Sequence, residues 1–188
     1  MNRDLTHYIH HLKGFQSIEL CNNVLKEIKD ISYKEHTFYN PNTNQAKPRS
    51  GSQELSISFD NVPSKKPLQE KLWHAIKDYQ NKHNLPWFKS WQGYSSIRFN
   101  KYSENKKMAL HCDHIHSLFD GNKKGIPILS VLGGLNNDYE GGEFVIFDDL
   151  KIDLKAGDVL LFPSLFLYPH KVEPVTKGTR YSYISWIW

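Results

Sequence analysis

The chain has 188 residues, of which 39% are hydrophobic and 23% charged, and it carries a formal net charge of +4. This composition excludes a disordered chain, and the length suits one domain with a substantial core better than two. The positive charge comes from scattered lysines. Because a nucleic-acid module usually shows a basic stripe or a known motif, we expect no nucleic-acid partner.

The two cysteines, Cys21 and Cys112, imply no disulfide framework, which is typical of a reducing compartment. The first residues, MNRDLTHYIHHLK, lack the apolar core of a signal peptide. No apolar run approaches the roughly 18 residues that a membrane span needs. We therefore expect no membrane partner and a cytoplasmic location, which would be the host cytoplasm for a viral protein. The oligomeric state does not follow from the sequence.

Two amphipathic helices are predicted in the first half of the chain. Ser17 is a typical N-cap residue, and Leu20, Val24 and Ile28 follow it at four-residue spacing. We expect this helix to lie against a sheet. A second helix is predicted to end before Pro86. It is indicated by apolar and aromatic residues at helical spacing, namely Leu68, Leu72, Ile76 and Tyr79.

Between these helices, residues 33–53 are polar and interrupted by prolines and glycine. This pattern predicts a long connection with one strand near residues 37–39. Such a connection is either a binding loop or a plain insertion, and the sequence leaves both readings open. Leu55, Ile57 and Phe59 then alternate with polar residues and predict a strand with one buried face.

The second half of the chain predicts short strands separated by glycine-containing turns. Helices followed by many strands indicate an α+β fold whose second part is a sandwich or barrel. We expect a single domain over residues 1–188, with helical support over about 1–90 and a catalytic β-core over about 91–188. The predicted strands are 94–100, 110–114, 128–132, 143–147, 151–154, 158–162 and 180–186.

A histidine and a carboxylate stand two positions apart within the sequence HCDHIH. Side chains at i and i+2 of an extended segment point to the same face, so His111 and Asp113 can reach one point in space. His170, on a distant strand, would complete two histidines and one carboxylate on one side of a metal. That set is the facial triad of non-haem Fe(II) oxygenases. His114 and His116 compete for the role, but only His111 has a carboxylate two residues on.

The last predicted strand contains an arginine on the same face as apolar residues. By alternation Arg180 shares one face with Ser182, Ile184 and Trp186. A buried arginine without an anion is costly, so we expect a ligand carboxylate that pairs with its planar guanidinium.

His111-x-Asp113, then His170, then Arg180 ten residues later resembles the 2-oxoglutarate- and Fe(II)-dependent oxygenases, in particular the prolyl 4-hydroxylase-like branch. The text between them is similar too: DYEGGEF at 138–144, AGDVLLFP at 156–163, and HKVEPV followed by GTRYS within 170–182. The resemblance runs from about Tyr94 to Trp186, and the helical part agrees only in general layout. It implies a double-stranded β-helix, or jelly-roll, cupin-like core with N-terminal supporting helices.

By position, the resemblance implies that His111, Asp113 and His170 bind Fe(II), while Arg180 binds the distal carboxylate of 2-oxoglutarate. No catalytic side chain beyond the metal ligands is implied, because the metal carries the hard chemistry.

Five further residues are expected at the site. Ser182 and Tyr102 resemble residues that bind the cosubstrate, and Trp186 resembles a tryptophan near the metal. Met108 and Arg98 are expected to line the active site on the substrate side.

The chain departs from the family pattern at two places. Met108 stands where many members have a tyrosine, and Gly133 and Gly134 stand where bulkier residues are common. Both departures are expected to widen the substrate side of the pocket, which leaves the substrate open.

The resemblance implies a dioxygenase that uses Fe(II), 2-oxoglutarate and O2, with ascorbate as an optional stimulant, and that couples hydroxylation to formation of succinate. We expect a proline-containing protein or peptide substrate, contacted by residues 33–53 and 114–125. Two alternatives stay open: the same chemistry on a free amino acid or small molecule, and a cupin-like binding module without catalysis.

Overall fold

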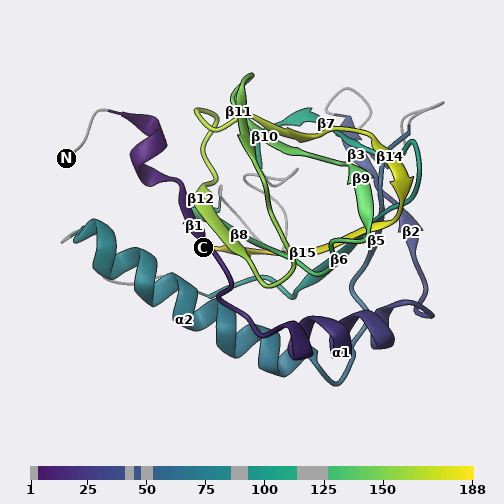
Figure 1. Cartoon of the computed structure of the whole chain (residues 1–188). Coiled ribbons are helices and arrows are strands. Elements are labelled where there is room, and N and C mark those ends of the chain that lie inside the picture. The colour runs from purple at the N-terminus through teal and green to yellow at the C-terminus, as the bar shows by residue number, and fades with distance from the viewer. Residues whose placement is uncertain (1–3, 41–44, 48–52, 86–92, 114–126) are drawn as a thin grey trace.

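The computed structural model describes residues 4–40, 45–47, 53–85, 93–113 and 127–188. Within these ranges, two layers are visible: a barrel built from two facing β-sheets, and two α-helices that lie beneath one of the sheets (Figure 1). The strand pairs within all the sheets are antiparallel. This is the arrangement of a double-stranded β-helix, so the predicted α+β class is confirmed.

The major sheet has seven strands in the described part of the chain, in the order β1-β12-β8-β15-β6-β5-β2. They are β1 (His10–Leu12), β12 (Val159–Pro163), β8 (Leu129–Gly134), β15 (Arg180–Ile187), β6 (Arg98–Tyr102), β5 (Ser56–Ser58) and β2 (Lys34–Glu35).

The minor sheet faces the major one and has the order β11-β10-β13-β7. Its strands are β11 (Leu150–Ile152), β10 (Phe144–Ile146), β13 (His170–Val172) and β7 (Met108–His111). Two smaller ladders pair β14 (Val175–Gly178) with β9 (Tyr139–Gly141), and β3 (Phe38–Asn40) with β4 (Gln45–Lys47). A short 3-10 helix, η1 (Leu5–Tyr8), precedes β1.

The helices form where the periodicity predicts them. In α1 (Ile18–Ile28), the Ser17 hydroxyl accepts a hydrogen bond from the Leu20 backbone N–H at 3.2 Å, and Val24 and Ile28 are buried. α2 (Lys65–His83) begins one turn before the predicted apolar set and ends at Asn84, which adopts the left-handed conformation with φ of 41°. Asparagine tolerates this conformation, so it is a natural stop for the helix.

Strand alternation divides the interior into two cores. On β15, Tyr183 and Ile187 pack toward the helices, whereas Ile184 and Trp186 pack between the two sheets. Because side chains alternate, Arg180 and Ser182 also point between the sheets. The barrel interior is therefore where polar residues of β15 can meet those of the minor sheet.

Two sequence expectations about local packing are wrong. Phe59 is 53% exposed, so the predicted buried face of its strand is limited to Leu55 and the partly buried Ile57. Gly133 and Gly134 do not widen the pocket either. A side chain at 133 would collide with the ring of Tyr183, and one at 134 would collide with the Lys155 backbone. These glycines admit close neighbours instead.

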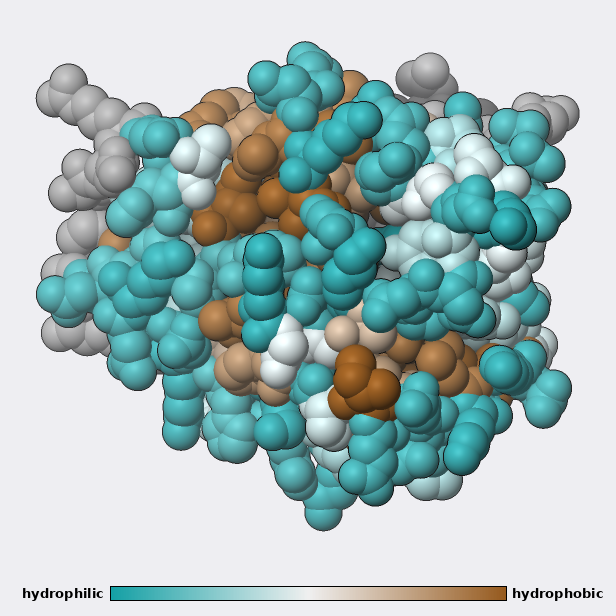
Figure 2. Space-filling view, in the orientation of Figure 1, coloured by the Kyte–Doolittle hydropathy of each residue, from teal (hydrophilic) through white to brown (hydrophobic). Residues whose placement is uncertain are grey.

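The predicted strands of the second half are present with shifted ends. β9 and β14 were missing from the prediction, and β13 was expected only as the strand of His170, without bounds. In the first half, β1, β2 and β4 were missing as well. Strands of two to four residues are too short to show a period of two. Hydrophilic residues cover most of the face drawn in Figure 2, with hydrophobic patches between them. Among the described residues, no helix is both long and apolar enough to cross a membrane.

Candidate metal centre and anion pocket

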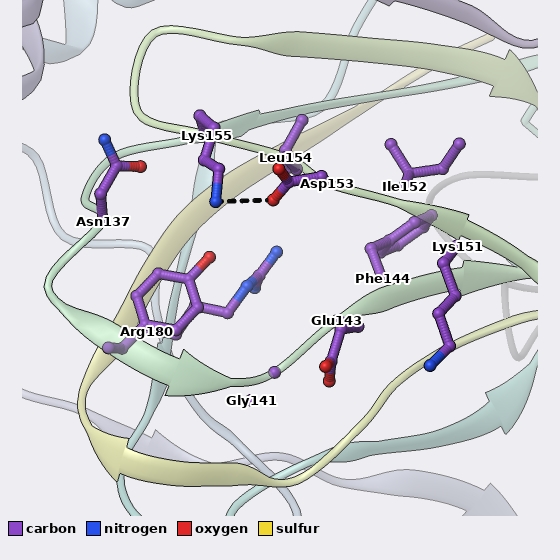
Figure 3. A pocket seen from close by; sticks show the side chains of 12 residues that line it. Asn137, Gly141, Glu143, Phe144, Lys151, Ile152, Asp153, Leu154, Lys155 and Arg180 are labelled. Atoms are coloured by element: carbon purple, nitrogen blue, oxygen red, sulfur yellow. Dashed lines mark ion pairs between the residues drawn. The ribbon is translucent and has the colours of Figure 1, made fainter.

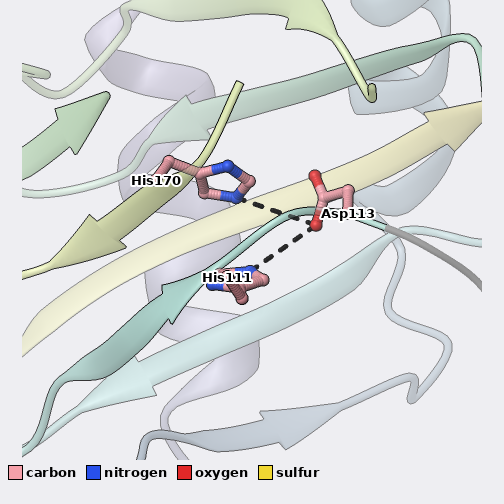
Figure 4. Close-up of side chains that lie close together, drawn as sticks. All are labelled: His111, Asp113 and His170. Atoms are coloured by element: carbon pink, nitrogen blue, oxygen red, sulfur yellow. Dashed lines mark ion pairs between the residues drawn. The ribbon is translucent and has the colours of Figure 1, made fainter. Parts of the chain in front are cut away.

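Pairing of two minor-sheet strands brings the two candidate histidines together. His170 on β13 lies directly opposite His111 on β7, and their ring centroids are 4.3 Å apart. Asp113 follows β7 and places its Oδ1 3.6 Å from His111 Nε2 and 3.7 Å from His170 Nε2 (Figure 4). All three candidate ligand atoms lie within 4.8 Å of one another, which is close enough for one ion to bind all three residues.

Backbone carbonyl groups fix the tautomer of both imidazoles. His111 Nδ1 lies 2.8 Å from the Ala109 carbonyl oxygen, and His170 Nδ1 lies 3.0 Å from the Tyr168 carbonyl oxygen. A carbonyl oxygen only accepts, so each Nδ1 carries the proton and donates it. The Nε2 lone pairs then face Asp113. Metal-binding histidines are typically oriented by such a second hydrogen bond, so the chain fits a metal with nitrogen and oxygen ligands.

Burial sets the charges of the triad. It lowers the pKa of His170 to about 4, so this imidazole is neutral at physiological pH. For Asp113, burial alone would raise the pKa, but attraction to the adjacent imidazoles in their protonated form and a hydrogen bond from Ser130 lower it well below its usual range. A neutral histidine beside an ionised carboxylate is the protonation state in which both bind a metal.

These pKa values predict an acid-sensitive fold. Between pH 6.5 and about 4, the unfolded chain binds a proton at residue 170 that the folded chain does not. As the pH is lowered from 6.5 to about 4, the free energy of unfolding of the metal-free protein should therefore decrease, by up to about 3 kcal/mol from this residue. Burial also lowers the pKa of His83 to about 4, so this histidine contributes to the same pH dependence. Urea unfolding of a His170→Gln variant as a function of pH separates the contribution of His170 from that of His83. An unchanged pH dependence in that variant would contradict the assignment to His170.

A chain of two buried hydroxyl groups orients Asp113. Ser130 on β8 lies with its Oγ 2.5 Å from Asp113 Oδ2, and the Ser164 Oγ lies 2.6 Å from the Ser130 Oγ. The ionised carboxylate only accepts, so Ser130 donates to Asp113 and Ser164 donates to Ser130. This leaves Asp113 Oδ1 facing the histidines. Sequence analysis missed both serines, although Ser130 is the one hydroxyl among the apolar residues of the predicted strand 128–132.

Replacing Ser130 with alanine should weaken metal binding. The variant leaves Asp113 Oδ2 without its donor, and loss of such an outer-shell partner typically lowers metal affinity by about 10- to 100-fold. Titration of the purified protein with Co(II) measures the effect. Ser185→Ala is a matched control, because Ser185 is fully buried but donates to the Ser95 carbonyl oxygen instead. Equal Co(II) affinity in both variants would show that Ser130 does not orient Asp113.

Arg180 lies in the same cavity as the triad and is 2% exposed. Its Nη1 donates to the Ser182 hydroxyl at 3.1 Å, and its guanidinium carbon lies 5.0 Å from the centre of the Tyr102 ring. Gly142 makes room for it, because a Cβ there would come within 3.0 Å of Arg180 Cδ and the backbone φ of +66° favours glycine. Glycine is therefore favoured at 142 because the Arg180 side chain packs against the backbone there.

The structure places the other predicted residues around this cavity, which has a volume of about 30 Å³. Tyr102 and Arg98 enter it from β6, and Met108 enters it from β7. Trp186 does not line the cavity directly. It lies beside the cavity, and the centre of its ring is 4.8 Å from the guanidinium carbon of Arg98. The apolar part of the wall consists of Met108, Leu132, Phe144, Val172 and Ile184. His114, His116 and residues 114–125 lie outside the described residues, as do parts of 33–53.

A second cavity of about 360 Å³ shares Arg180 and Phe144 with the first. Figure 3 shows the guanidinium of Arg180 reaching toward this space, across from the ion pair of Lys155 with Asp153 at 2.8 Å. Lys151 and Glu143 also line it. Arg180 therefore separates the two cavities, and a substitution there alters both.

Comparison with known proteins shows which family model and which named relatives this chain matches. Residues 97–188 match the family model described as the 2OG-Fe(II) oxygenase superfamily. A PKHD-type hydroxylase of Xylella fastidiosa (strain M12) is 31% identical over 145 residues, which cover 67% of this chain. This chain spans only 59% of the length of that relative.

Solved structures share the fold. A viral collagen prolyl hydroxylase from Paramecium Bursaria Chlorella virus-1 superposes with a TM-score of 0.67 at 18% identity, covering 96% of this chain and 94% of the other. A prolyl hydroxylase from Trichoplax adhaerens, solved with a hypoxia inducible factor peptide, gives 0.71 at 17% identity, covering 97% and 84%. The family match and this fold agree with the predicted resemblance. Through residues 97–188 the chain belongs to the 2OG-Fe(II) oxygenase superfamily, and its fold is that of solved prolyl hydroxylases.

Proposed function

We propose that this chain is an Fe(II)- and 2-oxoglutarate-dependent dioxygenase that hydroxylates a peptidyl residue, with proline as the expected target. The observation that carries the proposal is the position of Arg180. A guanidinium that is almost fully buried lies in one cavity with the triad, and no carboxylate of the described residues lies within ion-pair distance of it. A buried cation in this setting calls for an anion to bind it, because a desolvated unpaired charge is costly.

In this proposal each residue has one task. His111, Asp113 and His170 hold Fe(II), which together with 2-oxoglutarate and O2 supplies the oxidising chemistry. Arg180 binds the distal carboxylate of 2-oxoglutarate, since its planar fork matches a carboxylate in two parallel hydrogen bonds.

Ser182 and Tyr102 position that guanidinium from two sides. The Ser182 hydroxyl accepts one of its N–H groups, and the Tyr102 ring lies against its face. Met108, Leu132 and Phe144 keep the space beside the metal apolar, which limits the access of water. No side chain other than the metal ligands needs to accept or donate a proton.

The peptide substrate is the finer part of the proposal. The relative from Xylella fastidiosa is named a PKHD-type hydroxylase, and the Trichoplax adhaerens prolyl hydroxylase was solved with a peptide. These names favour a proline-containing peptide over a free amino acid. The cytoplasmic location expected from the sequence likewise stays a prediction.

The test is succinate formation by the purified protein with Fe(II), 2-oxoglutarate and ascorbate, with and without a proline-rich peptide. We expect turnover that the peptide stimulates, together with a mass increase of one oxygen atom in the peptide. Turnover that the peptide leaves unchanged would retain the oxygenase but contradict the peptide substrate. An absence of both turnover and metal binding would contradict the proposal and favour the binding-module alternative.

A further inference from the structure

A second arginine faces the same cavity. Arg98, on β6, donates from Nε to the Asn100 side-chain oxygen at 2.9 Å, and its guanidinium carbon lies 4.8 Å from the centre of the Trp186 ring. An arginine has five N–H donors in a fixed plane. Stacking on Trp186 and the bond to Asn100 fix that plane and use one donor. The remaining donors form a preoriented fork in the cavity that contains His111 and Asp113.

The charges that line this cavity do not balance. Its described lining contains two guanidinium groups, Arg98 and Arg180, and a single carboxylate, Asp113. Among the described residues, no carboxylate lies within 4.0 Å of either guanidinium. A divalent metal would add more positive charge, and 2-oxoglutarate, a dianion, would not neutralise all of it. A desolvated guanidinium without an anion is costly, so one further negative group is expected.

Strand register separates the two arginines. On the paired strands β6 and β15, Arg180 lies opposite Tyr102, whereas Arg98 lies opposite Ile184. Four residues of strand separate these levels, about 13 Å along the sheet. A 2-oxoglutarate molecule held between the metal and Arg180 therefore leaves Arg98 without an anion. Arg180 is 2% exposed, whereas Arg98 is only partly buried, so Arg98 lies on the more accessible side.

We propose that Arg98 is a specificity-determining residue that binds a carboxylate of the substrate beside the metal. This inference rests on the proposed function, because it assigns the second anion to the molecule that is hydroxylated. Two sources share the chemistry: a free C-terminal carboxylate on the target residue, and an acidic side chain next to it. In either case the pairing is a bidentate hydrogen bond from the Arg98 fork, which a neutral amide cannot replace.

The experiment uses the protein loaded with Mn(II) and 2-oxoglutarate in the absence of oxygen. Paramagnetic relaxation of the acetate methyl protons reports acetate bound near the metal, and acetamide is the neutral comparison. We expect acetate to bind the wild-type complex at least about tenfold more tightly than acetamide, as hydrogen bonds to charged groups provide. Arg98→Gln should reduce acetate binding to the acetamide level, and Arg98→Lys should give an intermediate value.

Two controls make the result specific. Lys101→Gln removes one positive charge from the same strand, but Lys101 lies 5.2 Å from the Tyr33 ring and does not line the cavity, so it should leave acetate binding unchanged. Mn(II) and 2-oxoglutarate affinities are measured first in wild type and in Arg98→Gln. Failure of wild type to bind Mn(II) or 2-oxoglutarate would overturn the proposed function. Normal binding of both with equal binding of acetate and acetamide would overturn only the role of Arg98.

Three proline derivatives then distinguish the two sources by the same relaxation measurement. N-acetylproline carries a terminal carboxylate, N-acetyl-aspartyl-prolinamide carries a side-chain carboxylate, and N-acetylprolinamide carries neither. We expect one of the first two to bind at least about tenfold more tightly than the third, and this preference to vanish in Arg98→Gln. Equal binding of all three, or a preference that survives in Arg98→Gln, would contradict a carboxylate-binding role for Arg98.

Discussion

Replacing Asp113 with alanine should abolish metal binding and succinate formation. Asp113 supplies the only carboxylate of the cluster formed by His111, Asp113 and His170 in the described chain, and two neutral imidazoles alone form a weak site. The loss should exceed the 10- to 100-fold drop in metal affinity that is typical when an outer-shell partner is removed. Isothermal titration with Mn(II) or Co(II) and a succinate assay measure the two effects.

The structure also predicts how the stability of this variant should behave. Metal binding stabilises the folded state by mass action, so wild-type protein should melt at a higher temperature when Co(II) is added. The Asp113→Ala variant should lose this increase. Asp149→Ala is a control, because Asp149 is an exposed aspartate in the turn between β10 and β11. Asp113→Ala protein that still binds Co(II) like wild type would rule out the triad as the metal site.

Replacing Arg180 with glutamine should weaken 2-oxoglutarate binding while metal binding is retained. Removing one partner of a buried, hydrogen-bonded charge pair costs about 2–5 kcal/mol, which corresponds to a loss of affinity between about 30-fold and several thousandfold. The 2-oxoglutarate affinity of Arg180→Lys should lie between those of wild type and Arg180→Gln, because an ammonium group provides a point charge but not a planar fork. The KM for 2-oxoglutarate and its dissociation constant from the Mn(II)-loaded protein are the measurements.

Arg180→Gln should not destabilise the ligand-free fold strongly. In the described chain, Arg180 makes one hydrogen bond to the Ser182 hydroxyl and contacts the Tyr102 ring, without a carboxylate partner. Removing a buried charge that has no counter-charge also removes its desolvation cost, which offsets the lost contacts. A variant that melts like wild type yet binds 2-oxoglutarate weakly would separate the role of Arg180 in binding from its role in packing. An unchanged affinity for 2-oxoglutarate would exclude Arg180 as the carboxylate site.

The alternation of residues on single strands allowed much of the site to be predicted. A period of two places Arg180 and Ser182 on one face of β15, and the structure has them both in the cavity. The helix periodicity around Val24 and Leu72 also identified the layer beneath the major sheet. These features depend on neighbours along the chain, so a single sequence contains them.

Contacts between distant segments were decided by the tertiary structure. The pairing of β7 with β13 sets His111 opposite His170, and only the fold brings Ser130 and Ser164 into line with Asp113. A hydroxyl in a buried strand signals that it has a partner, but the sequence does not say which one.

The two glycines of β8, Gly133 and Gly134, also show that packing between distant segments cannot be predicted from the sequence. An unusual residue in a sequence pattern does not reveal on which face of the sheet it lies or what fills the space beside it. Tyr183 and the Lys155 backbone occupy the space that Gly133 and Gly134 were expected to leave for substrate. The sequence by itself identified His111, Asp113, His170 and Arg180 as the candidate residues, because alternation and motif spacing are read along the chain. The tertiary structure alone decided which atoms meet, because packing is settled between segments far apart in the chain.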